Sequence, residues 1–164
     1  MAKRESVSRS FFLEQFTYSP TASRFDMLNE PNAEAKANLR NIIRKIAQPI
    51  VDHFKKPLKI NSGYRSPQVN VAVGGAPKSQ HVTGEAIDIE IEGLSNKVLA
   101  DWIDKNVVYD QLILEFYNPM EGVNSGWVHV SLKRTGNNRK SKLVAYKNGK
   151  TTKYETVTDF SKVK

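Results

Sequence analysis

The sequence contains no cysteine, so disulfide-stapled folds and metal sites built on thiolates are excluded. It has no apolar run near the ~18 residues of a membrane span, and its first residues lack the apolar stretch of about 7–15 residues that a secretory signal needs. We therefore expect no membrane insertion, and synthesis in the cytoplasm without a signal peptide. Repeats and low-complexity linkers are also missing, which favours a single domain over residues 1–164, with residues 1–10 loose.

Positive charge exceeds negative charge in what is present. The chain has 25 Lys and Arg against 17 Asp and Glu, which gives a net charge of +8 at neutral pH. This balance favours a polyanionic partner: nucleic acid, an anionic membrane, or the phosphate-rich polymers of a bacterial envelope. The basic residues are scattered, however, and they form neither a basic helical stripe nor the aromatic-basic pattern of an RNA-binding sheet. We therefore expect no nucleic acid partner.

Helical signals come mostly before strand signals. The apolar residues of 31–54 recur at i, i+3 and i+4, which predicts a long helix that Pro49 should kink or break. Ser66 and Ser95 are expected to cap two further helices. Strands are predicted at residues 58–61, 86–92, 111–117, 127–132, 143–147 and 151–156. Asn148-Gly149 is a strong hairpin signal. The pattern predicts an α+β fold, an antiparallel sheet with helices packed on one face.

Three of these strands alternate in polarity with a period of two. Asp88 lies between two isoleucines, His129 between two valines, and Glu115 between a leucine and a phenylalanine. Successive side chains of a strand point to opposite faces of its sheet. The aliphatic residues therefore pack against the helices, and Asp88, Glu115 and His129 share the opposite face.

The spacing of two strands suggests a register. If Glu115 lies directly opposite His129, the connecting turn centres on Gly122, since (115 + 129)/2 = 122. Residues 118–126 form an obvious loop around that glycine. A shift of one residue would place the two side chains on opposite faces.

His81 adds a second imidazole to this face. It lies seven residues before Asp88, and Gly84 between them allows a tight turn. With His129, these residues make a donor set of two nitrogens and one carboxylate, which suits one Zn²⁺ ion and leaves a fourth position for water. Zinc lowers the pKa of such a water towards about 7, and Glu115 could take its proton and pass it to a leaving amine. We expect the zinc site on the sheet face away from the helices.

Each residue also has a plain structural alternative when it is taken alone. A strand imidazole often only satisfies a hydrogen bond, and Asp88 or Glu115 could belong to a weak surface ion pair. His53 is interpreted as structural, because a cation suits the end of the first long helix. Trp127 and Tyr117 could line a substrate cleft or merely cover the sheet.

Three segments together resemble one family. Residues 79–88, S-Q-H-V-T-G-E-A-I-D, fit the pattern S-x-H-x-x-G-x-A-x-D, and residues 127–129 (W-V-H) and 61–66 (N-S-G-Y-R-S) accompany them. These segments resemble the M15 zinc peptidases, which include D-alanyl-D-alanine carboxypeptidases and dipeptidases and the related phage L-alanyl-D-glutamate endolysins. The resemblance extends over residues 11–147.

The resemblance implies roles for the candidate residues. The two histidines and Asp88 would bind one zinc ion, and Glu115 would be the catalytic carboxylate. Many family members carry the acidic residue three positions before the last histidine, where this chain has Gly126. Glu121, in the loop between the two strands, is therefore kept as an alternative general base.

Substrate contacts are implied as well. Arg65, in the upstream segment, would hold the substrate carboxylate or stabilise the tetrahedral oxyanion. Ser79, Tyr64 and Trp127 are assigned to substrate binding on the same grounds.

The function implied is that of a monomeric zinc metallopeptidase that hydrolyses an amide bond in the peptide stem or cross-link of bacterial peptidoglycan. Peptidoglycan lies outside the membrane, and no export signal is seen, which favours a phage or prophage lysis enzyme released by a holin, or a virion-associated protein. The main alternative is a phage virion module that keeps the fold with weak or no hydrolysis. The scissile bond (D-Ala-D-Ala, a cross-bridge or L-Ala-D-Glu), the choice between endo- and carboxypeptidase activity, and the host stay open.

Overall fold

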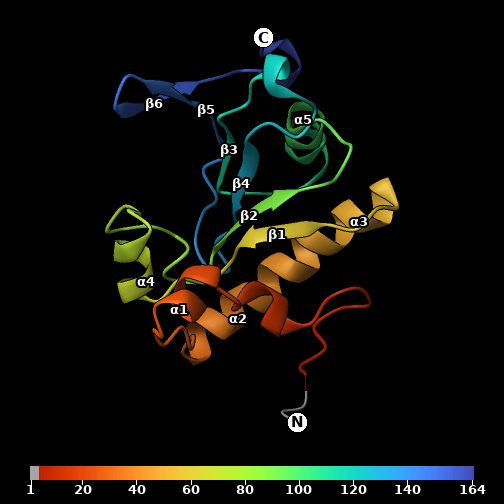
Figure 1. Ribbon diagram of the computed structural model, residues 1–164. Coiled ribbons are helices and arrows are strands. Elements are labelled where there is room, and N and C mark those ends of the chain that lie inside the picture. Colours follow the sequence, from red (N-terminus) through yellow and green to blue (C-terminus); the bar gives the residue numbers. More distant parts are fainter. Residues whose placement is uncertain (1–3) are drawn as a thin grey trace.

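A six-stranded sheet organises the computed structural model, which describes residues 4–164 (Figure 1). Its strands are β1 (Lys59–Ser62), β2 (Ala86–Glu90), β3 (Gln111–Glu115), β4 (Trp127–Ser131), β5 (Ser141–Asn148) and β6 (Thr151–Thr156). They lie in the order β1-β2-β4-β3-β5-β6, and each neighbouring pair is antiparallel except β3 with β5. The expected α+β class is confirmed, and the parallel pair is a departure from a purely antiparallel sheet.

The parallel pair follows from the position of β4. Both edges of β4 are occupied, by β2 and by β3, so the next strand extends the sheet beyond β3. β4 ends beside the start of β3, where Ser131 lies opposite Gln111, and residues 132–140 cross to the other edge of β3, where Ser141 lies opposite Gln111. β5 therefore runs in the direction of β3. Asn148-Gly149 then turns the chain into β6 as predicted, with a φ of +62° at the glycine.

The helices lie before and between the strands. The α-helices are α1 (Pro20–Arg24), α2 (Ala33–Ile42), α3 (Gln48–Phe54), α4 (Pro67–Ala72) and α5 (Asn96–Asn106). Short 3-10 turns are η1 (Leu13–Phe16), η3 (Pro119–Glu121) and η4 (Phe160–Lys162), and η2 (Ile43–Ala47) is π-helical. Ser66 caps α4 by accepting a hydrogen bond from the Val69 N–H, whereas Ser95 occupies the cap position of α5 without such a bond.

The long helix predicted over 31–54 is the succession α2, η2 and α3. Its path continues through Pro49, and the wider π-helical turn immediately precedes it. Gln48 donates its N–H to the carbonyl of Ile43, five residues back. Because Pro49 has no N–H and its ring crowds the preceding turn, the expected disturbance takes the form of this wider turn.

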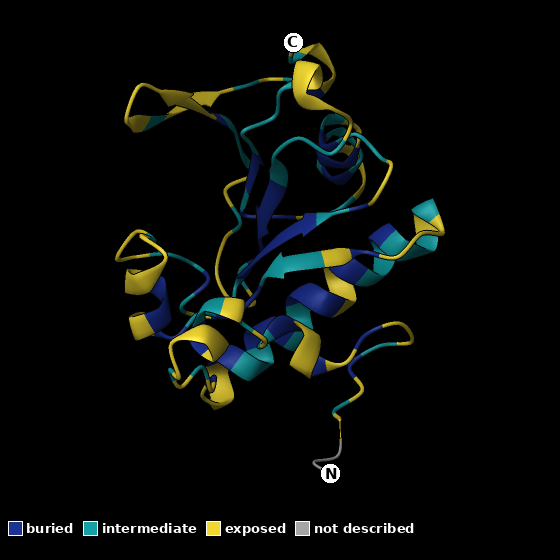
Figure 2. Cartoon of the chain, in the orientation of Figure 1, coloured by how far each residue is buried: buried dark blue, intermediate teal, exposed yellow. Residues whose placement is uncertain are grey.

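The aliphatic faces of β2, β3 and β4 are buried against the helices. Core side chains with essentially no exposure include Ile87, Ile89, Leu112, Leu114, Val128 and Val130 from the strands and Leu39, Ile42, Ile46, Leu99 and Ile103 from the helices. Figure 2 shows this buried layer between sheet and helices, with the β5–β6 hairpin mostly exposed. The opposite face of the central strands is left for the polar residues, as the alternation predicts.

The register of β3 and β4 differs from the expected one. Ile113, rather than Glu115, lies opposite His129, and Glu115 lies opposite Trp127. The expectation was wrong by two residues, because the chain re-enters the sheet through Gly126, whose φ is +67° and whose missing Cβ lets the Glu115 carbonyl approach. A shift of two preserves the face, so Glu115 and His129 stay on the same side.

The start of the chain was expected to be loose over residues 1–10. Residues 1–3 lie outside the described part. In residues 4–10, Val7 is buried, its carbonyl accepts a hydrogen bond from Arg44, and Ser6 forms a β-bridge with Phe12. Within residues 4–164, no helix has the length and apolar character needed to cross a bilayer.

Candidate active site

Three potential metal ligands converge on the polar face of the sheet. Asp88 in β2 and His129 in β4 are directly opposite in register, and His81 reaches them from the turn before β2. His129 Nδ1 lies 2.9 Å from Asp88 Oδ1, and His81 Nε2 lies 3.2 Å from that oxygen and 3.3 Å from His129 Nδ1. All three side chains are buried. One donor atom of each therefore faces a common point.

A backbone carbonyl fixes the ring of His81. Its Nδ1 lies 2.7 Å from the carbonyl oxygen of Gly63, in the segment after β1. A carbonyl only accepts hydrogen bonds, so Nδ1 carries the proton and Nε2 presents its lone pair to the other two ligands. Metal-binding histidines are commonly oriented in this way by a partner of the second ring nitrogen.

The turn between the first two ligands depends on Gly84. Its φ is +74°, and a Cβ there would come within 2.5 Å of the Ala35 carbonyl oxygen in α2. The backbone N–H of Arg65 donates to the carbonyl of His81 at 3.1 Å, and Asn38 donates to the carbonyl of Thr83 at 2.9 Å. The turn is thereby held against both α2 and the β1–α4 segment.

Burial and charge keep His81 and Asp88 in the protonation states that a metal requires. Burial lowers the pKa of His81, although Asp88 opposes the effect, so the imidazole is neutral at pH 7. Burial also acts to raise the pKa of Asp88, but His81 and His129 outweigh it and hold this pKa well below its usual range. The site therefore offers the neutral imidazole of His81 and the ionised carboxylate of Asp88.

This donor set fits a zinc ion. With its proton on Nδ1, His81 directs an acceptor nitrogen at the Asp88 carboxylate 3.2 Å away, so no hydrogen atom lies between them. A divalent cation would satisfy both acceptors. Two ligands bound tetrahedrally at about 2.1 Å are about 3.4 Å apart. The observed separations of 3.2 and 3.3 Å are close to that value, and the third, 2.9 Å, is shorter.

Glu115, the last residue of β3, lines the same cleft as His129 and Arg65. Burial raises the pKa of Glu115 to about 7, the charge of Asp88 adds to the rise, and His129 and Arg65 act against it. Trp127 places its indole N–H near this carboxyl without a hydrogen bond of normal geometry. A carboxyl that titrates near neutral pH can both accept and donate a proton.

Arg65, between β1 and α4, places a largely buried guanidinium beside the ligands. Its Nη2 lies 3.6 Å from Asp88 Oδ2, and its Nη1 donates to Asn70 Oδ1 at 3.3 Å. Its Nε is buried and has no hydrogen-bond partner among residues 4–164. Burial lowers the pKa of Arg65, and the charges of Asp88 and Glu115 oppose this, so the group stays protonated. The cleft thus contains a fixed cation with free hydrogen-bonding capacity.

A family profile described as Peptidase M15 matches residues 13–131, from the start of η1 to the end of β4. The chain belongs to the M15 peptidase family. As an M15 peptidase it is a metallopeptidase, and the matched span contains all three converging ligands as well as Arg65 and Glu115. Among curated proteins, none matches the chain.

The structure separates the two candidate bases of this M15 peptidase. Glu115 lies at the cleft, whereas Glu121 is exposed in η3, and its carboxylate accepts a hydrogen bond from Asn118. Glu121 does not line the cleft. The geometry therefore favours Glu115.

The three predicted substrate contacts lie in different places. Ser79 lines the cleft and accepts a hydrogen bond from the His81 N–H at 3.3 Å. Trp127 is partly buried and packs on Phe116, with 5.1 Å between ring centroids. Tyr64 instead belongs to the core, with 7% of its surface exposed, because the segment after β1 is pinned to η1 and turns this ring inward. Tyr64 is not among the residues that line the cleft.

The remaining cleft residues of the M15 peptidase were not singled out from the sequence. The cleft has a volume of about 480 Å³, and its further lining includes Lys78, Gln80, Ile113, Arg139, Leu143 and Tyr154. Ile113 could have been found, because it alternates with Glu115 on the same strand face. Leu143 in β5 and Tyr154 in β6 lie beyond the matched span, and only the parallel pairing of β5 with β3 brings them to the cleft.

Proposed function

We propose that this M15 peptidase is a zinc enzyme that hydrolyses an amide bond in the peptide stem or cross-link of bacterial peptidoglycan. One observation carries the proposal: three donor atoms converge at a point whose cleft also contains a near-neutral carboxyl and a fixed guanidinium. This combination supplies what amide hydrolysis requires, which is a ligand set, a proton carrier and a cation for developing negative charge.

The metal site would use His81 Nε2, Asp88 Oδ1 and His129 Nδ1. Bound there, zinc supplies Lewis acidity that polarises a carbonyl and makes water nucleophilic at neutral pH. The three ligands leave room in a tetrahedral arrangement for one more group. Residues of the protein would carry out proton transfer and stabilise the developing negative charge.

Glu115 is the proton carrier in this proposal. Its carboxylate accepts the proton of the attacking water and then donates it to the nitrogen of the leaving amine. In the metal-free protein burial raises the pKa of Glu115 to about 7, so its carboxyl can exchange a proton near neutral pH, as a residue that acts first as base and then as acid must.

Arg65 is the electrostatic partner. Its guanidinium is held by Asn70 and faces Asp88, so its position is fixed before the substrate arrives. A preorganised cation stabilises negative charge without reorganisation during the reaction. The charge could be the oxyanion of the tetrahedral state or a carboxylate of the substrate peptide.

The net charge of +8 supports a cell-wall target, because bacterial walls are polyanionic and attraction speeds encounter. As a further part of the proposal, the enzyme acts in wall lysis by a phage or prophage. Expression in bacteria with and without a holin tests this part: lysis is expected only when the holin is present.

Digestion of purified peptidoglycan tests the reaction. Wild-type protein with added zinc is expected to release products whose masses identify the bond and separate endo- from carboxypeptidase activity. His81→Ala should reduce the rate by at least about 10³-fold, because the ligand set is broken. His53→Ala is the matched control, since this exposed imidazole packs on Trp102 and Phe54 and does not line the cleft.

Equal digestion by wild type and His81→Ala would overturn the metal-dependent reaction. Wall binding by wild type without any cleavage product would instead favour the non-catalytic virion module.

A further inference from the structure

A second buried carboxylate lies close to the ligand-bearing turn. Asp110, directly before β3, has no exposed surface. It accepts hydrogen bonds from the backbone N–H of Arg139 at 3.0 Å, from its Nε at 3.1 Å and from its Nη2 at 2.6 Å. Lys133 Nζ is 3.5 Å away. Gln80 Nε2 donates to the same carboxylate at 3.0 Å.

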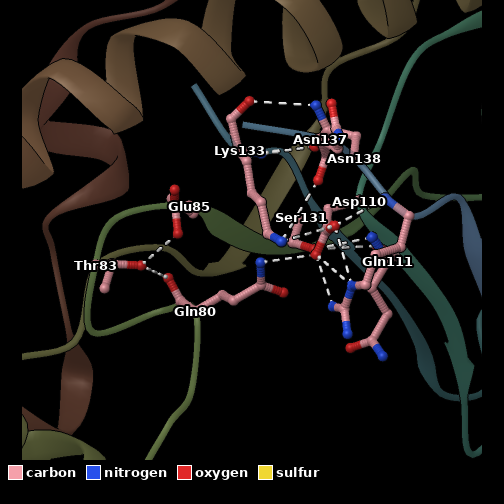
Figure 3. Close-up of polar contacts among 10 residues, drawn as sticks. Gln80, Thr83, Glu85, Asp110, Gln111, Ser131, Lys133, Asn137 and Asn138 are labelled. Atoms are coloured by element: carbon pink, nitrogen blue, oxygen red, sulfur yellow. Dashed lines mark hydrogen bonds and ion pairs between the residues drawn. The ribbon is translucent and has the colours of Figure 1, made fainter. Parts of the chain in front are cut away.

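Two of the contacts of Asp110 lead to the metal ligands. Gln80 directly precedes His81 in the chain, so its side chain ties the ligand-bearing turn to the start of β3 (Figure 3). The backbone N–H of Asp110 donates to the carbonyl of Ser131 at 2.7 Å, two residues after His129. Asp110 thus connects the segments of both histidine ligands.

The other end of the turn is closed independently. Thr83 Oγ1 donates to the Gln80 carbonyl at 3.1 Å and lies 2.9 Å from Glu85 Oε2, as Figure 3 shows. These local bonds hold the shape of the turn. At the end of the turn, the N–H of Leu132 donates to the carbonyl of Glu85 at 2.9 Å and ties it to β4. The Gln80 side chain ties the start of the turn, next to His81, to β3, because it crosses to Asp110.

Asp110 is ionised despite its burial. Burial acts to raise its pKa, but the hydrogen bonds from Arg139 and Gln80 lower it to about 2. A buried charge is costly unless it is fully paired, and pairs that only stabilise a fold are often replaceable by apolar residues. The hydrogen bond from Gln80 connects the Asp110 carboxylate to the turn that carries His81, which points to a role beyond stabilising the fold.

We propose that Asp110 is a positioning residue for the metal centre, which holds the His81 turn in register with β3 and β4 through the side chain of Gln80. The inference rests on the proposed function, because it presupposes that His81 binds a metal. Second partners of ligand residues commonly change metal affinity by about 10–100-fold when they are removed.

Zinc affinity, measured by competition with a chromogenic chelator, is the test. Gln80→Leu removes the bond to Asp110 and leaves the Asp110–Arg139 pair intact. Asp110→Asn removes the charge. Each variant is expected to bind zinc about tenfold more weakly than wild type. The double variant should be no weaker than Gln80→Leu alone, since Asp110→Asn weakens the same Gln80–Asp110 bond that Gln80→Leu removes.

Asp104→Asn is the matched control. Asp104 is also a shielded carboxylate, with 10% of its side chain exposed, and it pairs with Lys142 at 3.0 Å and with Tyr109. It has no contact with the His81 turn among its hydrogen bonds and ion pairs. This variant should lose thermal stability while its zinc affinity stays that of wild type.

The results separate the two levels of the proposal. If wild type binds no zinc, the proposed metal site is wrong. If wild type binds zinc but Gln80→Leu binds it equally well, the positioning role is overturned and the metal site stands. The same conclusion follows if Asp104→Asn weakens zinc binding as much as Asp110→Asn does. Gln80→Leu gives a result even if Asp110→Asn does not fold.

Discussion

The carbonyl oxygen of Gly63 lies 2.7 Å from Nδ1 of His81, and this contact decides which ring nitrogen can bind a metal. Gly63 is itself closely packed, because a Cβ at this position would overlap the carbonyl oxygen of Phe16 in η1. The same oxygen accepts the N–H of Tyr64 at 2.7 Å. The orientation of the His81 ring at the proposed metal site therefore depends on contact between the β1–α4 segment and η1.

Gly63→Ala should disturb this arrangement. The added methyl group must displace either η1 or the Gly63 carbonyl. Displacement of the carbonyl would release the His81 ring from its hydrogen bond. We expect zinc affinity to fall roughly tenfold and the free energy of unfolding to fall by about 1–3 kcal/mol. Chelator competition and urea unfolding measure the two effects.

Gly136→Ala is the control for this change. Gly136 has a φ of +84°, but a Cβ there would meet no atom within 4 Å. Its substitution strains the backbone by about 1 kcal/mol and should not alter zinc binding. Wild-type zinc affinity in Gly63→Ala would show that the carbonyl contact does not orient the ligand.

The sequence predicted the shared face of the site because strand alternation depends only on local order. Asp88 and His129 alternate with buried aliphatic residues, so a correct strand assignment was enough to place them together. The same reasoning survived a register error of two residues for Glu115, since an even shift preserves the face.

Features that depend on long-range packing could not be predicted in this way. The inward ring of Tyr64 follows from contact with η1, nearly fifty residues earlier in the chain. The entry of Tyr154 into the cleft follows from the parallel β3–β5 pair, which a hairpin signal does not reveal. The Asp110–Gln80 contact links residues 30 positions apart and has no periodic signature.

Glu115→Gln should remove the proton carrier while the metal ligands remain. We expect kcat to fall by about 10²–10⁴-fold, the usual contribution of general acid–base catalysis, with zinc affinity little changed. Glu121→Gln is the control, because that side chain is exposed and does not line the cleft. If Glu121→Gln loses activity and Glu115→Gln keeps it, the assignment of the base must be reversed.

Stability of the metal-free protein should depend on the raised pKa of Glu115. The folded pKa is about 7 against an ordinary 4.5, so the folded state binds this proton more tightly than the unfolded state. The resulting stabilisation is fully present below about pH 4.5 and is lost as pH rises through about 7. The loss is about 3 kcal/mol, since one pKa unit corresponds to about 1.4 kcal/mol.

His81 acts in the opposite direction over part of this range. Its lowered pKa means that the folded state resists protonation, so its contribution rises as pH increases towards neutrality. The measurement is therefore the difference in unfolding free energy between wild type and Glu115→Gln from pH 4.5 to 8. A difference that does not change with pH would contradict the raised pKa.

Arg65→Lys should distinguish the two roles open to the guanidinium. Lysine keeps the charge but loses the planar fork that is held by Asn70 and faces Asp88. If Arg65 binds a substrate carboxylate in the ground state, KM rises roughly tenfold with kcat unchanged, and the effect disappears when the peptide ends in an amide. If it stabilises the oxyanion, kcat falls roughly tenfold or more for both peptides, because that charge exists only in the transition state. Steady-state kinetics with the paired acid and amide peptides gives the answer, and unchanged kcat and KM for both would remove Arg65 from the reaction.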